Sequence, residues 1–138
     1  MPVSTAPKLK QFARRLLEWE AAPGEPADVR ETAAFRVCEK LRGPLGKLMG
    51  IAGFRSLFSR ALTLAGTEVS WLRVLQIKAD GSLEGLQELE VQLNSRTADE
   101  GEIVLVARLL GLLVTFIGPA LTVRLLHDAW PELDDLNF

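Results

Sequence analysis

The chain has 138 residues, of which 48% are hydrophobic and 25% are charged, and its formal net charge is −2. This length is typical of one domain with a core of its own, and the hydrophobic content excludes a disordered tail. Nucleic-acid-binding domains usually carry a strong positive excess, so the net charge argues against nucleic acid as a partner.

The charge is unevenly distributed along the chain. Residues 1–60 carry a net charge of +5 and residues 61–138 a net charge of −7. We expect the two halves to pack against each other, or against a second copy in a homodimer, through complementary surfaces. Cys38 is the only cysteine, and the first fifteen residues contain no apolar signal region. Both features predict a cytoplasmic protein.

The first half of the chain contains two clear helix patterns. Residues 8–21 are predicted to be helical, and a Pro- and Gly-containing loop follows at residues 23–26. The second predicted helix begins near Asp28 as N-cap and ends at Gly43–Pro44. The residues expected to face the core are Leu9, Phe12, Ala13, Leu16 and Leu17 in the first helix, and Ala34, Val37, Cys38 and Leu41 in the second.

A third helix is predicted over residues 44–65, but its apolar side changes direction partway along. The change falls between Gly50 and Gly53, where glycine makes a bend easy, so we expect a kink or two shorter helices. Gly46, Gly50 and Gly53 also form a smooth patch. Close helix packing is the simpler explanation for it, and a shallow groove for a partner's helix or an apolar ligand is the functional one.

Two short helices are predicted next, one beginning near Thr67 or Glu68 and one over residues 83–93, with Ser82 as its cap. The intervening segment can also be interpreted as a strand and a tight turn, because Asp80–Gly81 is a hairpin signal. Thr97 and Glu100 then form a capping box that opens a long last helix. This helix should be kinked or divided at Gly118–Pro119 and should end at Trp130–Pro131.

Residues 103–126, IVLVARLLGLLVTFIGPALTVRLL, are apolar almost all the way round a helix. Such a helix must be buried, in a protein core or in a bilayer. Only fifteen uncharged residues separate Arg108 from Arg124, whereas a membrane span needs roughly 20. We therefore predict an all-α fold: residues 1–138 form a single bundle of about five or six helices with this helix at its centre.

No residues combine into a catalytic or metal-binding motif. The lone His127 is explained by its place near a helix C-terminus, and Cys38 by its place on an inward helix face. Gly46–Lys47 does not match a phosphate-binding loop, since no strand precedes it and Leu48 stands where Ser or Thr is needed. We expect no enzymatic activity, no cofactor and no metal. A set of basic residues is a candidate surface for an acidic partner or simply a solvated face: Arg36, Lys40, Arg42, Lys47, Arg55 and Arg60.

The tail at residues 130–138, WPELDDLNF, alternates bulky apolar residues with acids. This composition is typical of a short docking peptide, although such residues can also fold back over the bundle. We expect a non-enzymatic adaptor or regulatory protein that binds another protein. Membrane insertion of residues 103–126 and carriage of an apolar small molecule are the alternatives. The predicted partner-binding residues are Gly46, Gly50, Gly53, Trp130, Leu133, Leu136 and Phe138.

Overall fold

The computed structural model describes residues 7–20, 33–85, 89, 93 and 95–132. These residues are mostly helical, as predicted for an all-α protein. The α-helices are α1 (Pro7–Glu20), α2 (Ala33–Glu68), α4 (Ser95–Ile117) and α5 (Pro119–Ala129). Between α2 and α4 lie a short 3₁₀ helix, η1 (Ser70–Val74), and the two-residue strands β1 (Gln76–Ile77) and β2 (Leu83–Glu84).

α1 follows its predicted pattern closely. Phe12, Ala13, Leu16 and Leu17 are buried and Leu9 is half-buried against the core. The 3.6-residue period of the helix places these residues on one stripe, so a single face of α1 covers α4. The beginning of the second predicted helix, near Asp28, lies outside the described residues.

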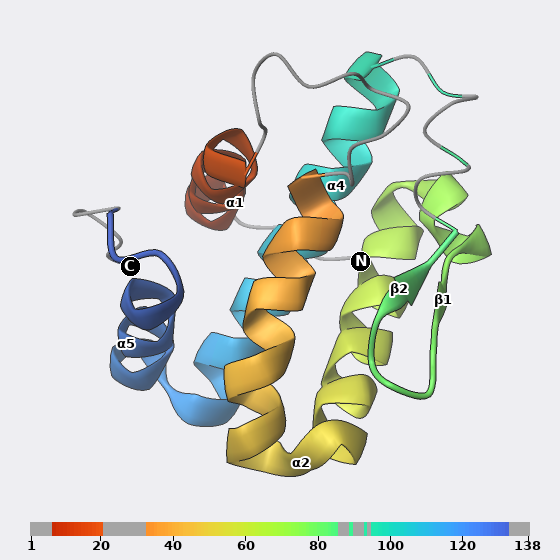
Figure 1. Cartoon of the computed structure of the whole chain (residues 1–138). Helices are drawn as coiled ribbons and strands as arrows, with labels where there is room; N and C mark the ends of the chain where they lie inside the picture. The colour runs from red at the N-terminus through yellow and green to blue at the C-terminus, as the bar shows by residue number, and fades with distance from the viewer. Residues whose placement is uncertain (1–6, 21–32, 86–88, 90–92, 94, 133–138) are drawn as a thin grey trace.

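α2 turns back on itself at Gly50, within the predicted bend (Figure 1). Gly50 has φ 77° and ψ 159°, a conformation that is essentially restricted to glycine. We call residues 33–49 the first arm and residues 51–68 the second arm. The predicted helix end at Gly43–Pro44 is wrong, because Pro44 lies inside the first arm. The missing hydrogen bond of Pro44 is outweighed by Leu41 and Leu45, both fully buried on either side of it.

Residues 70–85, which directly follow α2, are not the helix, turn and helix start that the periodicity favours. Within them only η1 is helical, and β1 and β2 form an antiparallel pair with Gln76 opposite Glu84. Leu89, the one described residue near the middle of the second predicted helix, is helical. The turn is stabilised by Asp80, whose Oδ1 accepts hydrogen bonds from the backbone N–H (2.9 Å) and hydroxyl (2.6 Å) of Ser82. The Asp–Gly turn chemistry therefore overrides the helical spacing, and Ser82 does not cap a helix.

The remainder of the predicted helix over residues 83–93 falls mostly outside the described residues. α4 begins at Ser95, so Thr97 lies in the first turn of the helix and not at its N-cap. The helix packs against both α1 and α2 and supplies much of the core. Its most buried residues are Val104, Leu105, Val106, Ala107, Leu109, Leu110 and Leu113.

The chain leaves the helical conformation at Gly118 (φ 86°, ψ 159°), and α5 starts with Pro119. Proline suits this first helical position because its missing N–H would have no helical partner there. α5 ends at Ala129, as the Trp130–Pro131 signal predicts. Of the helices in the described ranges, none combines the length and the apolar character needed to cross a bilayer.

Polar contacts connect elements that are far apart in the sequence. The buried Glu102 carboxylate accepts a hydrogen bond from the backbone N–H of Ala34 (3.1 Å), at the start of α2. Arg108 of α4 forms an ion pair with Glu68 at the end of α2 (2.9 Å). A third contact, between Glu20 and Trp130, joins α1 to the residue that follows α5.

Candidate partner-binding site

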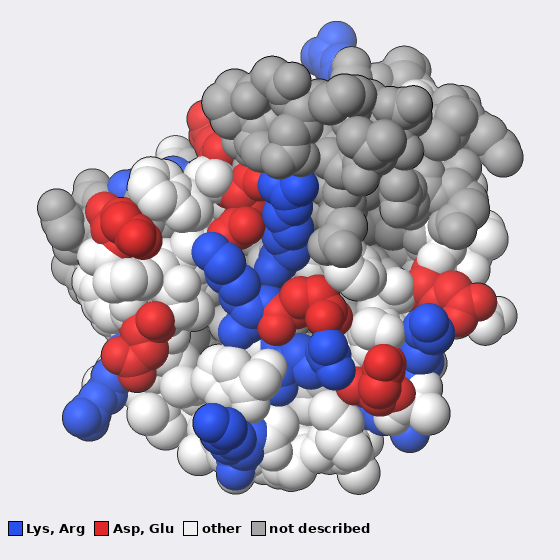
Figure 2. Space-filling model, in the orientation of Figure 1, with Lys and Arg blue, Asp and Glu red and all other residues white. Residues whose placement is uncertain are grey.

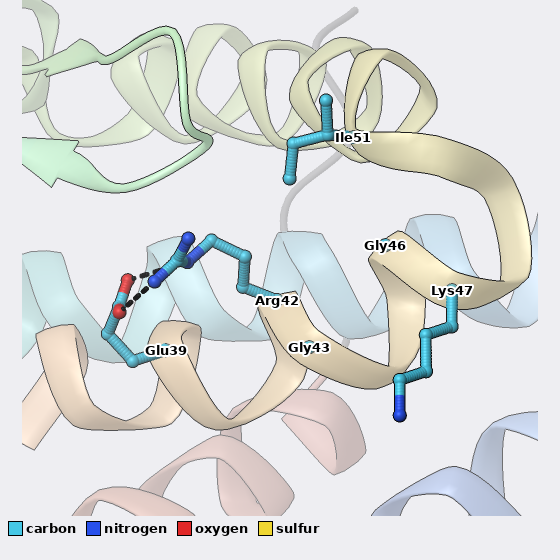
Figure 3. A pocket seen from close by; sticks show the side chains of 6 residues that line it. All are labelled: Glu39, Arg42, Gly43, Gly46, Lys47 and Ile51. Atoms are coloured by element: carbon cyan, nitrogen blue, oxygen red, sulfur yellow. Dashed lines mark hydrogen bonds and ion pairs between the residues drawn. The ribbon is translucent and has the colours of Figure 1, made fainter.

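An open pocket of about 410 Å³ lies beside the first arm of α2 (Figure 3). Its lining residues are Glu39, Arg42, Gly43, Gly46, Lys47 and Ile51. Five of them lie on the first arm, and Ile51 reaches over from the second arm just past the bend. We call this site the α2 pocket. The reversal at Gly50 creates it, because it brings Ile51 back toward Gly46.

Arg42 forms one wall of the α2 pocket. Its guanidinium makes two contacts with the Glu39 carboxylate, at 2.6 and 3.1 Å, and donates a hydrogen bond to the carbonyl oxygen of Asp80 (3.2 Å). The hydrogen bonds to Glu39 raise the pKa of Arg42 above its usual value, so Arg42 stays protonated in its ion pair with Glu39. The hydrogen bonds that Ser82 donates to the Asp80 carboxylate lower the pKa of Asp80. Asp80 therefore remains ionised in the hairpin turn.

The glycines of α2 differ in what the structure requires of them. Gly50 supplies the positive φ of the bend, and a Cβ on Gly53 would lie 3.2 Å from Met49. A Cβ on Gly43 would meet no atom within 4 Å, and one on Gly46 would meet only Ile51, at 3.8 Å. Neither Gly43 nor Gly46 is required by packing or backbone shape. Because Gly43 and Gly46 have no side chains, they leave the α2 pocket open.

The sequence pattern points to Gly46 but not to the side chains around it. In Figure 3, Arg42 and Ile51 extend on one side of the first arm, and Lys47 leaves it on the other side. A helical wheel treats Arg42 and Lys47 as part of a solvated face, because it places residues only around one straight axis. The predicted bend at Gly50 was the one sequence signal that could have placed Ile51 on the same side of the first arm as Arg42.

Trp130 is fully buried, so it packs onto the helical bundle. Of the two roles that the tail composition allows, docking to a partner and folding back over the bundle, Trp130 has the second. Its Nε1–H donates a hydrogen bond to Glu20 Oε2 (2.8 Å), and the ammonium group of Lys40 lies 5.5 Å from the ring centroid. Lys40 also forms an ion pair with the same Glu20 carboxylate (2.5 Å). The other predicted docking residues of the tail, Leu133, Leu136 and Phe138, lie outside the described residues, and their role stays a prediction.

Cys38 lies on α2 and His127 on α5. Cys38 is buried in the core, and His127 is half-buried in the last turn of α5. Among the described side chains, no three His, Cys, Asp or Glu residues come close enough together to hold a metal ion. The basic residues Arg36 and Arg55 donate hydrogen bonds to the carbonyl oxygens of Glu20 and Lys78.

We expect the Cys38 thiol to be inert in the folded protein. Burial, with smaller contributions from Glu39 and Glu102, raises its pKa from 9.0 to about 12. The lower thiolate fraction alone should slow its reaction with a disulfide reagent near pH 8 by about a thousandfold relative to an ordinary cysteine. Reaction should become fast when denaturant is added, and a native rate close to that of glutathione would contradict the prediction.

The same pKa shift predicts a loss of stability at high pH. The unfolded thiol ionises near 9.0, whereas the folded thiol stays protonated up to about 12. The unfolded state therefore releases a proton that the folded state retains, and the free energy of unfolding falls as pH rises through this range. Urea titrations of the wild type and of Cys38→Ala at pH 8 and pH 10.5 would measure the difference.

The chain was compared with protein-family profiles, with curated proteins and with solved structures, and none of the three comparisons finds a match.

Proposed function

We propose that this protein is a non-enzymatic adaptor or regulatory module that binds an acidic, partly apolar segment of another protein in the α2 pocket. The scaffold of this site is a single helical bundle. The apolar helix of residues 103–126, which is divided at Gly118–Pro119, lies at the centre of that bundle. The observation that carries the proposal is the pair of helix-interior glycines, Gly43 and Gly46, which open onto the pocket.

Glycine in a helix interior is about 1 kcal/mol less favourable than alanine. A packing contact with a neighbour would explain this loss, but a Cβ at Gly43 or Gly46 has ample room. We therefore explain Gly43 and Gly46 by the open space that they leave in the α2 pocket. A segment of a partner chain can approach the helix backbone closely at such a place.

The chemistry of the lining indicates which partner fits. Arg42 and Lys47 are cationic, and Ile51 offers an apolar surface that is 44% exposed. Glu39 is the one acid in the lining, and its carboxylate is already bound to Arg42. A segment with a carboxylate beside a bulky apolar side chain complements this lining. An apolar small molecule fits less well, because the charged side chains of Arg42 and Glu39 form one wall of the pocket.

Peptide selection tests the proposal even though the partner is unidentified. Peptides selected from a random displayed library against the full chain should be enriched in Asp or Glu next to Leu, Ile or Phe. Gly46→Leu, which fills the pocket, should weaken the binding of the selected peptides at least about tenfold by fluorescence anisotropy. Ser59→Leu adds the same side chain at an exposed position of the second arm and should leave affinity unchanged.

Three results would contradict this function. They are an enrichment of basic peptides, a failure to select any peptide, and equal binding by Gly46→Leu and the wild type. Circular dichroism of both variants serves as the folding control. The synthetic peptide PELDDLNF, copied from residues 131–138, can be compared in the same assay to test whether the predicted docking tail is a ligand of this kind.

A further inference from the structure

The bend of α2 and the junction between α4 and α5 lie at the same end of the molecule, the lower end in Figure 1. Each is a chain reversal at a glycine with φ near +80° and ψ 159°. Large apolar side chains next to these reversals are exposed. Leu48 and Ile51 flank Gly50 and are 49% and 44% exposed, and Phe116 is 68% exposed just before Gly118. Leu121, in the first turn of α5, is also exposed. We call these four apolar residues the bend end.

The two long segments that run through these reversals contain no acid. Residues 41–67 and residues 103–127 hold neither Asp nor Glu, although the chain as a whole has eighteen. The basic residues in the two segments include the exposed Lys47, Arg55, Arg60 and Arg124. In the view of Figure 2 the lower edge of the molecule shows mainly white atoms, with Lys or Arg side chains on it. Two acids lie near this end. The Asp80 carboxylate in the hairpin turn lies beside Arg42 and Lys78, and Glu39, which lines the α2 pocket with Ile51, is ion-paired with Arg42.

We infer that the bend end binds the surface of an anionic membrane. Bulky apolar side chains at a protruding end insert among lipid headgroups, and surrounding Lys and Arg side chains are attracted to anionic lipids. The same arrangement disfavours a symmetric contact between two copies of this end, because it would bring like charges together. The binding is peripheral, since no helix in the described part of the chain is suited to span the bilayer. The inference does not depend on an occupant of the α2 pocket.

Vesicle co-sedimentation tests this inference on the full chain. Vesicles of phosphatidylcholine with about a third phosphatidylserine should bind the protein at low salt, and vesicles of phosphatidylcholine alone should bind it at least about tenfold more weakly. The double variant Leu48→Ser/Phe116→Ser should lose at least about thirtyfold of the affinity. Val74→Ser is its control, because Val74 is 66% exposed but belongs to η1, away from the bend end.

A charge reversal tests the electrostatic part. Lys47→Glu should weaken binding to the anionic vesicles by at least about fivefold, since each basic residue near the surface contributes about that factor. Arg96→Glu, at the opposite end of α4, should change it much less. Gly46→Leu should leave vesicle binding intact while it weakens peptide binding, so the two proposals can fail separately.

Three outcomes would overturn the inference. The first is no binding to anionic vesicles at low salt, which would indicate that the bend end contacts a protein partner and not a membrane. The second is equal binding to vesicles with and without phosphatidylserine. The third is a loss with Val74→Ser as large as that with Leu48→Ser/Phe116→Ser, which would show that the bend end is not the region in contact with lipid.

Discussion

Replacing Trp130 with alanine should lower the free energy of unfolding by about 3–5 kcal/mol, the largest effect we expect from a single side chain. Trp130 is fully buried, and its truncation would leave a cavity between the end of α1, the first arm of α2 and the end of α5. It would also remove the hydrogen bond to Glu20, a buried carboxylate that would then keep Lys40 as its ion-pair partner. Urea unfolding followed by far-UV circular dichroism measures the change.

Trp19 provides a control of the same residue type. It lies one residue before Glu20 but is 47% exposed, so Trp19→Ala should change the free energy of unfolding by less than about 1 kcal/mol. Trp130→Phe keeps an aromatic ring but loses the N–H donor and part of the volume of the indole, which should cost about 1–3 kcal/mol. Equal destabilisation by Trp19→Ala and Trp130→Ala would show that the cluster around Glu20 does not hold the helix ends together.

Substituting alanine for Gly101 should destabilise the protein by about 1–3 kcal/mol, although alanine is the better helix former. A Cβ at this position would lie 2.2 Å from Cζ2 of Trp71, a distance that no real contact allows. The indole is rigid and half-buried, so relief requires η1 to move away from α4. Thermal unfolding and urea unfolding of the variant should both show the loss.

Gly43→Ala is the matched control for this prediction. It makes the same substitution inside another helix, but its new Cβ meets no atom within 4 Å. The variant should therefore be stabilised by up to about 1 kcal/mol from helix propensity alone. If Gly101→Ala is also stabilising, the close packing of Trp71 on α4 is wrong.

The apolar stripes of α1 and of the first arm of α2 were predictable from the sequence, because local periodicity determines which face a helix buries. The two glycine breaks were predictable for a similar reason. Each falls where the apolar pattern changes direction or where proline follows directly, as at Gly50 and Gly118. Both signals depend only on residues that are close together in the sequence, so they can be found without the structure.

Other features of the fold depend on contacts between residues far apart in the sequence, which the local hydrophobic periodicity does not reveal. The helix continues through Pro44 because Leu41 and Leu45 are buried by elements distant in the sequence. The segment around Asp80 follows its turn chemistry, because two hydrogen bonds from Ser82 to the Asp80 carboxylate and the positive φ of Gly81 favour a tight turn over a helix. For the same reason Gly46 could be named from the sequence, whereas Ile51 and the exposed Phe116 required the path of the chain in space.

The contact between Glu20 and Trp130 joins residues 110 positions apart. It closes almost the whole chain into one loop, and the elements inside that loop include both arms of α2 and all of α4. Fraying normally begins at the ends of a chain, where little is lost by opening. Here the first and last described helices secure each other, so amide protons in α1 and α5 should exchange together, in one cooperative opening, and not one helix at a time.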